Sequence, residues 1–439
     1  LIRSPTLRLP AIPVISALRP SFMMVILFRL SACIALFCLL ISLSGTSVQG
    51  QSGAGETGYW LEDEAFIPAA REAIRLIYNQ KPGASRAVLS PWLEQEPEHP
   101  LGYFWNGLEL WWYILADLEN EAYDDAFIRH LENADRAADR LLRKNRRHYD
   151  ALVLKSLSNA FLARMHANRE NWYSAFRHGR VAFNILQNTV QLYPEVSADA
   201  EFGFGLYSYF TAYIKDEYRL VKAVSWMLPA GDRALGLERL QEAAANGVFV
   251  QPEATYFLGH IYLHYEEAPA RAETYLTSLQ ENHPRNSFFN RLLLRTYFRQ
   301  NRPDEARRLN EELLRRYEAR ADTSGAHTAS PSVIERAQHN AVLSTLEELY
   351  TIRGQLFYQE FSYDEAILAF QEVVSLRPEL VGGAARRHQR ITAYQLGRSY
   401  VRKGNEEAAL PYFEALASAD GADDGLRELA EAELQRINE

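Results

Sequence analysis

Residues 393–413 read AYQLGRSYVRKGNEEAALPYF, and this stretch predicts two short helices joined by a turn. Leu396, Gly397 and Tyr400 recur at the three- and four-residue spacing that marks one face of a helix. Ala409 and Phe413 show the same spacing on the helix that follows. The stretch is therefore interpreted as a pair of helices packed against each other.

The same spacing recurs further upstream. Gly354 and Ala366 are 12 residues apart, as are the small residues of the first pair. Residues 257–276 hold a further pair with one extra residue in the turn, and its Ala272 precedes Ala306 by 34 residues. A fixed period of this length indicates stacked repeats of one helix pair each.

These units resemble the tetratricopeptide repeat (TPR) family. In that family the small residue of the first helix meets the alanine of the second, which implies a close crossing at Gly397 and Ala409. The resemblance implies an all-α fold, a right-handed α-α superhelix or TPR-like solenoid. The N-terminal half fits less well, since Tyr78 and Ala87 mark one degenerate pair and Gly205 another with a long insertion. Degenerate helix pairs are therefore expected there.

The pattern divides the chain into five segments. They are a signal peptide with an upstream segment (1–50), an N-terminal helical region with degenerate or expanded repeats (51–249), TPR-like repeats (250–320), a linker (321–334), and C-terminal TPR-like repeats with a capping helix (335–439). The last helix has the polar outer face that the end of a solenoid needs.

Residues 24–50 read MVILFRLSACIALFCLLISLSGTSVQG and match a secretory signal. One basic residue precedes fourteen mostly apolar ones, and Val48 and Gly50 are small enough for the sites that a signal peptidase recognises. We expect cleavage before Gln51 and a periplasmic or secreted protein. A retained membrane anchor is the alternative, because the residues before the basic one are also apolar, and Cys33 leaves a lipoprotein open. Membrane association is expected only if the signal stays uncleaved.

Composition excludes several classes of chemistry. The chain carries 56 acidic against 47 basic residues, a net charge of −9, so no nucleic-acid partner is expected. Cys33 and Cys38 are the only cysteines and lie in the signal, so the mature chain has no disulfide, cysteine nucleophile or cysteine zinc site. No Gly-Lys dipeptide, H-E-x-x-H or G-x-S-x-G motif occurs. We expect no cofactor.

Two features leave a functional reading open. His260 and His264 lie four residues apart with Glu267 three further on, a weak candidate metal site whose alternative is a pair of groove histidines. All seven tryptophans precede residue 230. They are interpreted as core packing, with an aromatic platform for sugars or peptides as the alternative.

The resemblance also implies a concave groove lined by side chains at fixed offsets from each small residue. The candidates for peptide contacts are Tyr256, His260, His264, Arg291, Arg295, Arg299, Tyr358, Tyr394, Arg398 and Arg402. Arginine binds carboxylates through two parallel hydrogen bonds, so an acidic peptide or a free C-terminus is the expected guest. The alternative is that these arginines pair with glutamates of the next helix.

The sequence thus predicts an exported, non-catalytic TPR-like scaffold that binds a protein or acidic peptide in its groove. Two alternatives remain at this stage. One is a helical-toroid enzyme acting on polysaccharide, favoured by the N-terminal tryptophans. The other is a sugar-binding subunit of an outer-membrane uptake complex, suggested by export together with helical repeats.

Overall fold

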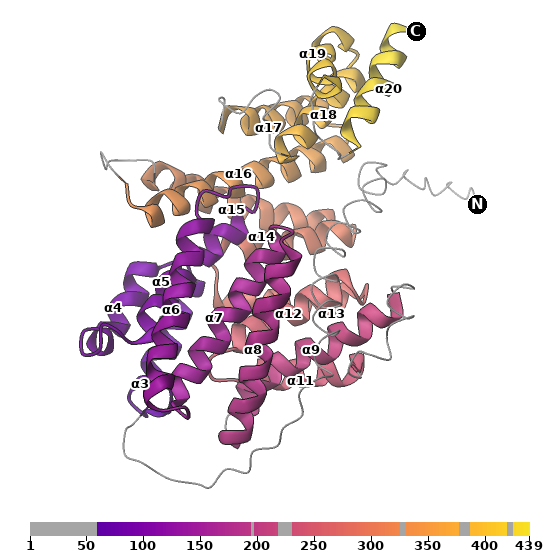
Figure 1. Cartoon of the computed structure of the whole chain (residues 1–439). Coiled ribbons are helices and arrows are strands. Elements are labelled where there is room, and N and C mark those ends of the chain that lie inside the picture. Colours follow the sequence, from indigo (N-terminus) through magenta and orange to yellow (C-terminus); the bar gives the residue numbers. More distant parts are fainter. Residues whose placement is uncertain (1–58, 195–196, 218–230, 325–330, 377–386, 419–424) are drawn as a thin grey trace. The chain divides into compact units, whose positions relative to one another are not determined.

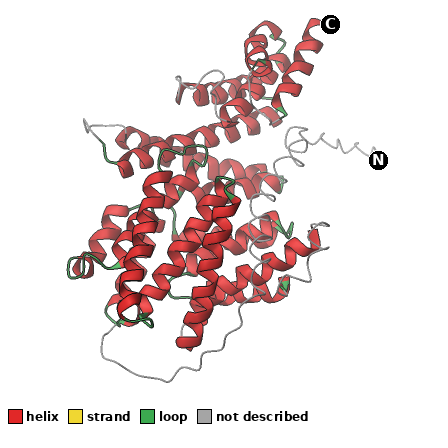
Figure 2. Cartoon of the chain, in the orientation of Figure 1, coloured by secondary structure: helices red, strands yellow, loops and turns green. Residues whose placement is uncertain are grey.

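The computed structural model describes residues 59–194, 197–217, 231–324, 331–376, 387–418 and 425–439, and every regular element in these ranges is a helix (Figures 1 and 2). The all-α prediction is confirmed. In chain order the elements are η2 (Trp60–Glu62), α3 (Phe66–Tyr78), α4 (Pro82–Leu93), α5 (Pro100–Ala116), α6 (Asp124–Lys144), α7 (Tyr149–Asn168), α8 (Trp172–Leu192), α9 (Ser197–Glu217), α11 (Arg233–Asn246), α12 (Gln251–His264), α13 (Pro269–Asn282), α14 (Ser287–Arg299), α15 (Pro303–Ser324), α16 (Val333–Gln359), α17 (Tyr363–Leu376), α18 (Arg387–Arg402), α19 (Glu406–Ala417) and α20 (Leu426–Asn438).

The described helices belong to two compact units. The N-terminal unit lies within Ser31–Leu349, and the C-terminal unit is formed by Tyr350–Glu439. Inside each unit, helices that follow one another in sequence pack side by side, as α7 does with α8 and α18 with α19. Contacts between sequence neighbours are what a stack of helix pairs requires.

One turn recurs between the helices of five pairs. A residue with positive φ follows the first helix, and the next backbone N–H donates to the carbonyl five residues earlier at 2.9–3.1 Å. This is the hydrogen-bond pattern of a Schellman motif. The positive-φ residues are Gln80, Glu170, Asn301, Phe361 and Gly404. Because Gln80 and Glu170 belong to the N-terminal half, its pairs α3–α4 and α7–α8 turn in the same way as the clearest repeats.

The pair α12–α13 confirms the extra residue expected in its turn. Glu267 has a φ of 49°, but here the following N–H, that of Ala268, reaches the carbonyl of Tyr262, six residues earlier. The turn is thus one residue longer than the other five, while the helices on either side still pack together.

Glycines mark the places where paired helices cross closely. A Cβ added to Gly397 would lie 2.8 Å from the ring of Phe413, and one added to Gly354 would lie closer still to the ring of Phe370. Heavy atoms do not approach that closely without displacement, so only glycine fits at either crossing. Ala409 is fully buried beside Phe413, but the ring, rather than the alanine, is the nearest group to Gly397.

Within the N-terminal unit, distant parts of the chain are joined by hydrogen bonds. Asn286 donates to the carbonyl of Tyr78 at 2.9 Å, and Gln80 donates to Ser287 at 3.1 Å. The carbonyl of Ala116, at the end of α5, accepts from Arg291 at 2.7 Å and from Ser344 at 3.1 Å. The C-terminal ends of α3 and α5 therefore pack against α14 and the N-terminal half of α16.

The described residues cover only part of the expected linker and none of the expected signal. Residues 321–324, placed in a linker by the sequence, continue α15, and residues 325–330 lie outside the described ranges. The expected signal, residues 1–50, also lies outside them. Among the residues that the structure describes, no helix combines the length and apolar character needed to cross a bilayer.

Candidate functional site

Two of the candidate arginines converge on one carboxylate in the N-terminal unit. Arg295 on α14 grips Glu348 on α16 through Nε and through Nη2, the latter at 2.6 Å. Arg291, one helical turn earlier, approaches the same carboxylate at 3.2 Å. The side chains of Arg291 and Glu348 are 5% and 4% exposed, whereas that of Arg295 is 42% exposed. Arg291 and Arg295 therefore follow the alternative prediction, in which these arginines pair with a glutamate of a following helix.

Electrostatics agree with this pairing. Burial lowers the pKa of Arg291, and the negative charge of Glu348 opposes that effect. For Arg295, the attraction of Glu348 outweighs burial and leaves the pKa raised. The carboxylate thus holds both guanidinium groups in their charged form. Arg291 also donates to the carbonyl of Ala116, so it is fixed by the fold itself.

Tyr256 is likewise part of the core and not of an open groove. It is 4% exposed, and the guanidinium of Arg164 on α7 lies 5.2 Å from its ring and 4.8 Å from that of Trp111. Arg164 pairs with Glu253 at 3.4 Å, and the hydroxyl of Tyr78 donates to the same carboxylate at 3.0 Å. Tyr256 on α12 is therefore covered by side chains of α3, α5 and α7 of the same unit.

His260 and His264 lie side by side on α12, with ring centroids 4.5 Å apart and the ring planes tilted by 48°. Burial, with Arg164 and Arg299 nearby, lowers the pKa of His260 to about 3, and burial beside His260 lowers that of His264 well below its usual range. Arg299 lies 3.2 Å from Nδ1 of His264. Both imidazoles are neutral at physiological pH.

The weak metal candidate is corrected by the geometry. Glu267 sits in the turn after α12 with its side chain exposed. Within the described ranges, no three His, Cys, Asp or Glu side chains gather closely enough to hold a metal ion.

Four of the seven tryptophans are buried in the core of the N-terminal unit. Trp60, Trp105, Trp111 and Trp112 are between 0% and 9% exposed. Trp111 stacks on Phe127 at 5.2 Å, and the ring of Trp112 meets Phe289 edge-on at 4.9 Å. These four rings pack in the core, whereas Trp92 and Trp172 are half-buried and Trp226 lies outside the described residues.

The remaining candidates form a second cluster in the C-terminal unit, which we call the Arg398 patch: Tyr358, Tyr394, Arg398 and Arg402. The guanidinium of Arg398 lies 5.1 Å from the ring of Tyr358 and 5.8 Å from that of Tyr394. Its Nη1 is buried and has no hydrogen-bond partner. Arg402 is exposed, and its interaction with the Tyr358 hydroxyl raises its pKa.

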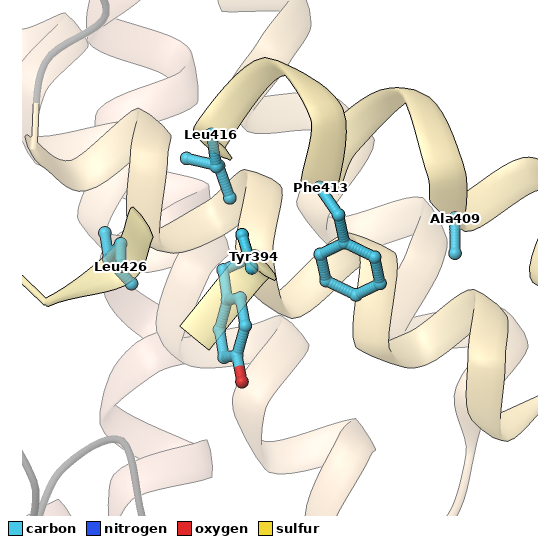
Figure 3. Close-up of a cluster of buried hydrophobic side chains, with 6 residues drawn as sticks. Tyr394, Ala409, Phe413, Leu416 and Leu426 are labelled. Atoms are coloured by element: carbon cyan, nitrogen blue, oxygen red, sulfur yellow. The ribbon is translucent and has the colours of Figure 1, made fainter. Parts of the chain in front are cut away.

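Packing behind the patch fixes its geometry. Tyr394 is 4% exposed, and its ring lies 5.9 Å from that of Phe413, within an apolar cluster that includes Leu416 and Leu426. Figure 3 shows the hydroxyl of Tyr394 pointing away from these apolar side chains. Tyr394 therefore serves as a rigid base for Arg398 rather than as an exposed contact.

The chain also shows its relationship to known proteins. A family model of the tetratricopeptide repeat matches residues 347–380 and 392–423, which cover the C-terminal part of α16 with α17, and most of α18 with α19. The C-terminal part of the chain therefore contains tetratricopeptide repeats. A search of curated proteins found no match.

Two solved structures resemble this chain. Yeast Tom70 shares 12% identity and a TM-score of 0.40, over 86% of this chain and 84% of that one. The human IFIT1 dimer with PPP-AAAA shares 14% identity and a TM-score of 0.30, over 81% of this chain and 86% of that one.

Proposed function

We propose that this protein is a scaffold whose C-terminal unit binds an acidic peptide, or a free chain terminus, at the Arg398 patch. One observation supports the choice of site. Glu348 neutralises Arg291 and Arg295, whereas Arg398 forms no ion pair with the described residues and its Nη1 is buried without a hydrogen-bond partner. Nε of Arg291 is also buried without a partner, but its guanidinium already has a counter-ion. A buried donor without a partner is unfavourable by about 1 to 3 kcal/mol, and a ligand carboxylate would relieve this.

The surroundings of Arg398 favour an anion as well. The rings of Tyr358 and Tyr394 restrict the guanidinium, so little side-chain entropy is lost when it binds. Arg402, one helical turn further along α18, adds a second exposed cation. Glu433 is the nearby carboxylate, and it is paired with Arg436 at 3.0 Å.

Binding of a fluorescein-labelled peptide that contains two adjacent glutamates tests this proposal. Anisotropy should show saturable binding to the full chain, weakened by salt, and no binding of the peptide with glutamines in place of the glutamates. Arg398→Gln should raise Kd about 10- to 100-fold, because a charge-assisted hydrogen bond contributes about 1.5 to 3 kcal/mol. Arg353→Gln, an exposed arginine on α16 in the same unit, is the matched control and should leave Kd unchanged. Equal Kd values for both variants would refute the site.

We also propose that the protein works outside the cytoplasm after its signal is removed. Support comes from the sequence of residues 24–50, with its apolar run and its small residues before Gln51. N-terminal sequencing of the protein purified from its native source should find Gln51 at or near the first position. Recovery from membranes with the apolar run intact would favour an anchor instead.

A further inference from the structure

Phe361 occupies a backbone position that suits it poorly. It is the left-handed residue of the turn between α16 and α17, with a φ of 63°. The matching turns elsewhere place Gln80, Glu170, Asn301 and Gly404 at this position. Left-handed backbone is readily adopted by glycine and tolerated by asparagine, whereas a bulky side chain there is an outlier.

Burial does not compensate for that backbone strain. The side chain of Phe361 is 66% exposed, and its ring meets only the edge of Tyr363, at a centroid distance of 6.4 Å. A glycine or asparagine would make the same turn without exposing an aromatic ring to water. Strain that the fold itself does not need is a reason to look for a role in binding.

The ring of Phe361 ends an aromatic path that starts in the Arg398 patch. Tyr363 lies 6.4 Å from Phe361 and 5.5 Å from Tyr358, and Tyr358 lies beneath the guanidinium of Arg398 at 5.1 Å. These separations limit the span from Arg398 to Phe361 to about five residues of extended peptide. One short ligand can therefore reach both ends.

We propose that this path is the docking surface for an extended peptide that carries an apolar side chain within about five residues of its carboxylate. The carboxylate binds Arg398 and Arg402, and the apolar side chain packs on Phe361 and Tyr363. This inference rests on the proposed function and adds the ligand's second determinant.

Charge favours a peptide over an anionic membrane as the occupant. Glu360 and Asp364 are exposed on either side of Phe361 in sequence, and Asp364 is paired with Lys403. Carboxylates beside the exposed ring repel anionic lipid headgroups, while an isolated apolar side chain of a peptide can still pack on the ring. Lys403 is a cation at this end, but its charge is neutralised by Asp364, whereas Arg398 and Arg402 supply positive charge at the other end of the path.

The inference is tested by measuring how two peptides bind to the parent chain and to the Phe361→Asn variant, with Leu368→Asn as the control variant. The probes are the labelled diglutamate peptide with leucine three residues from the glutamates, and the same peptide with alanine there. For the parent chain we expect the leucine peptide to bind about fivefold more tightly, from the apolar area it buries. Phe361→Asn should abolish that preference while leaving the alanine peptide's Kd unchanged. Leu368→Asn, which removes an equally exposed apolar side chain from ordinary helical backbone on α17, should preserve the preference.

Hydrogen exchange measures the strain separately. Asparagine tolerates the left-handed backbone, so Phe361→Asn should slow amide exchange in residues 357–366 of the full chain. Weaker binding together with greater protection cannot come from local unfolding. Faster exchange in the variant, or an unchanged preference for leucine, would overturn the inference.

The remaining outcomes separate this inference from the function on which it rests. If Arg398→Gln weakens both peptides but Phe361→Asn leaves the leucine preference intact, the apolar contact is wrong and the acidic-peptide site stands. If neither peptide binds the parent chain at low salt, both proposals fail. Binding to phosphatidylglycerol vesicles that is lost in Phe361→Asn, without any leucine preference, would identify a membrane contact and also refute the inference.

Discussion

Arg295 and Glu348 form a forked ion pair in which the glutamate is 4% exposed and the arginine lies at the surface of the N-terminal unit. Glu348 also neutralises Arg291, whose guanidinium is held in the interior by the carbonyl of Ala116. One carboxylate thus supports two cations, one of them buried. Its role is to stabilise the packing of α14 against α16 and α5.

Replacing Glu348 should therefore destabilise the N-terminal unit severely. Glu348→Gln leaves Arg291 buried without a counter-charge, and removing one partner of a buried pair costs about 3 to 5 kcal/mol. Urea unfolding followed by circular dichroism should show this loss in the free energy of unfolding. Glu311→Gln, at an exposed glutamate on α15, is the control and should change it by less than about 0.5 kcal/mol. A small effect of Glu348→Gln would mean that water or a relaxed Arg291 replaces the carboxylate.

Local patterns in the sequence predicted the helix pairs well because each pair is stabilised by contacts close in sequence. The crossing of Gly397 with its partner helix and the extra residue before Ala268 both depend on short-range spacing. The recurring turn shows that α3–α4 and α7–α8 are built in the same way as the later pairs.

The candidate site was predicted less well. The family's spacings specify the groove side chains of a single repeat, but they do not reveal which other helices pack over those side chains. Arg291 was placed along the groove, but no local pattern revealed that it pairs with Glu348. Nor did the sequence show that Arg164, almost a hundred residues upstream, would pack on Tyr256. Phe361 was missed altogether. An aromatic residue at the turn position occupied elsewhere by Asn301 and Gly404 was the available signal.

The crossing at Gly397 should tolerate no larger residue. Gly397→Leu places a side chain against the ring of Phe413, which is fully buried, so overpacking should cost about 1 to 3 kcal/mol. Hydrogen exchange in α18 and α19 should rise, because these helices form the crossing. Gly83→Leu provides the matched control, since a Cβ at Gly83 meets no atom within 4 Å. Equal protection in the two variants would contradict the close crossing.

Acid should destabilise the N-terminal unit through His260. The pKa of this histidine is about 3 in the folded chain and about 6.5 when unfolded, so between these values the unfolded state binds more protons. Stability is then complete above about pH 6.5 and falls as the pH drops towards 3. Glu253 acts in the opposite sense, because burial raises its pKa and its protonation in acid favours the folded state.

His260→Gln should therefore reduce the loss of unfolding free energy between pH 7 and pH 5 by about 1 to 2 kcal/mol. Urea unfolding of parent and variant at both pH values measures this difference, with the pH 7 pair as the control for any change in packing. An identical loss in the two proteins would show that His260 is already protonated in the fold or that it titrates normally there.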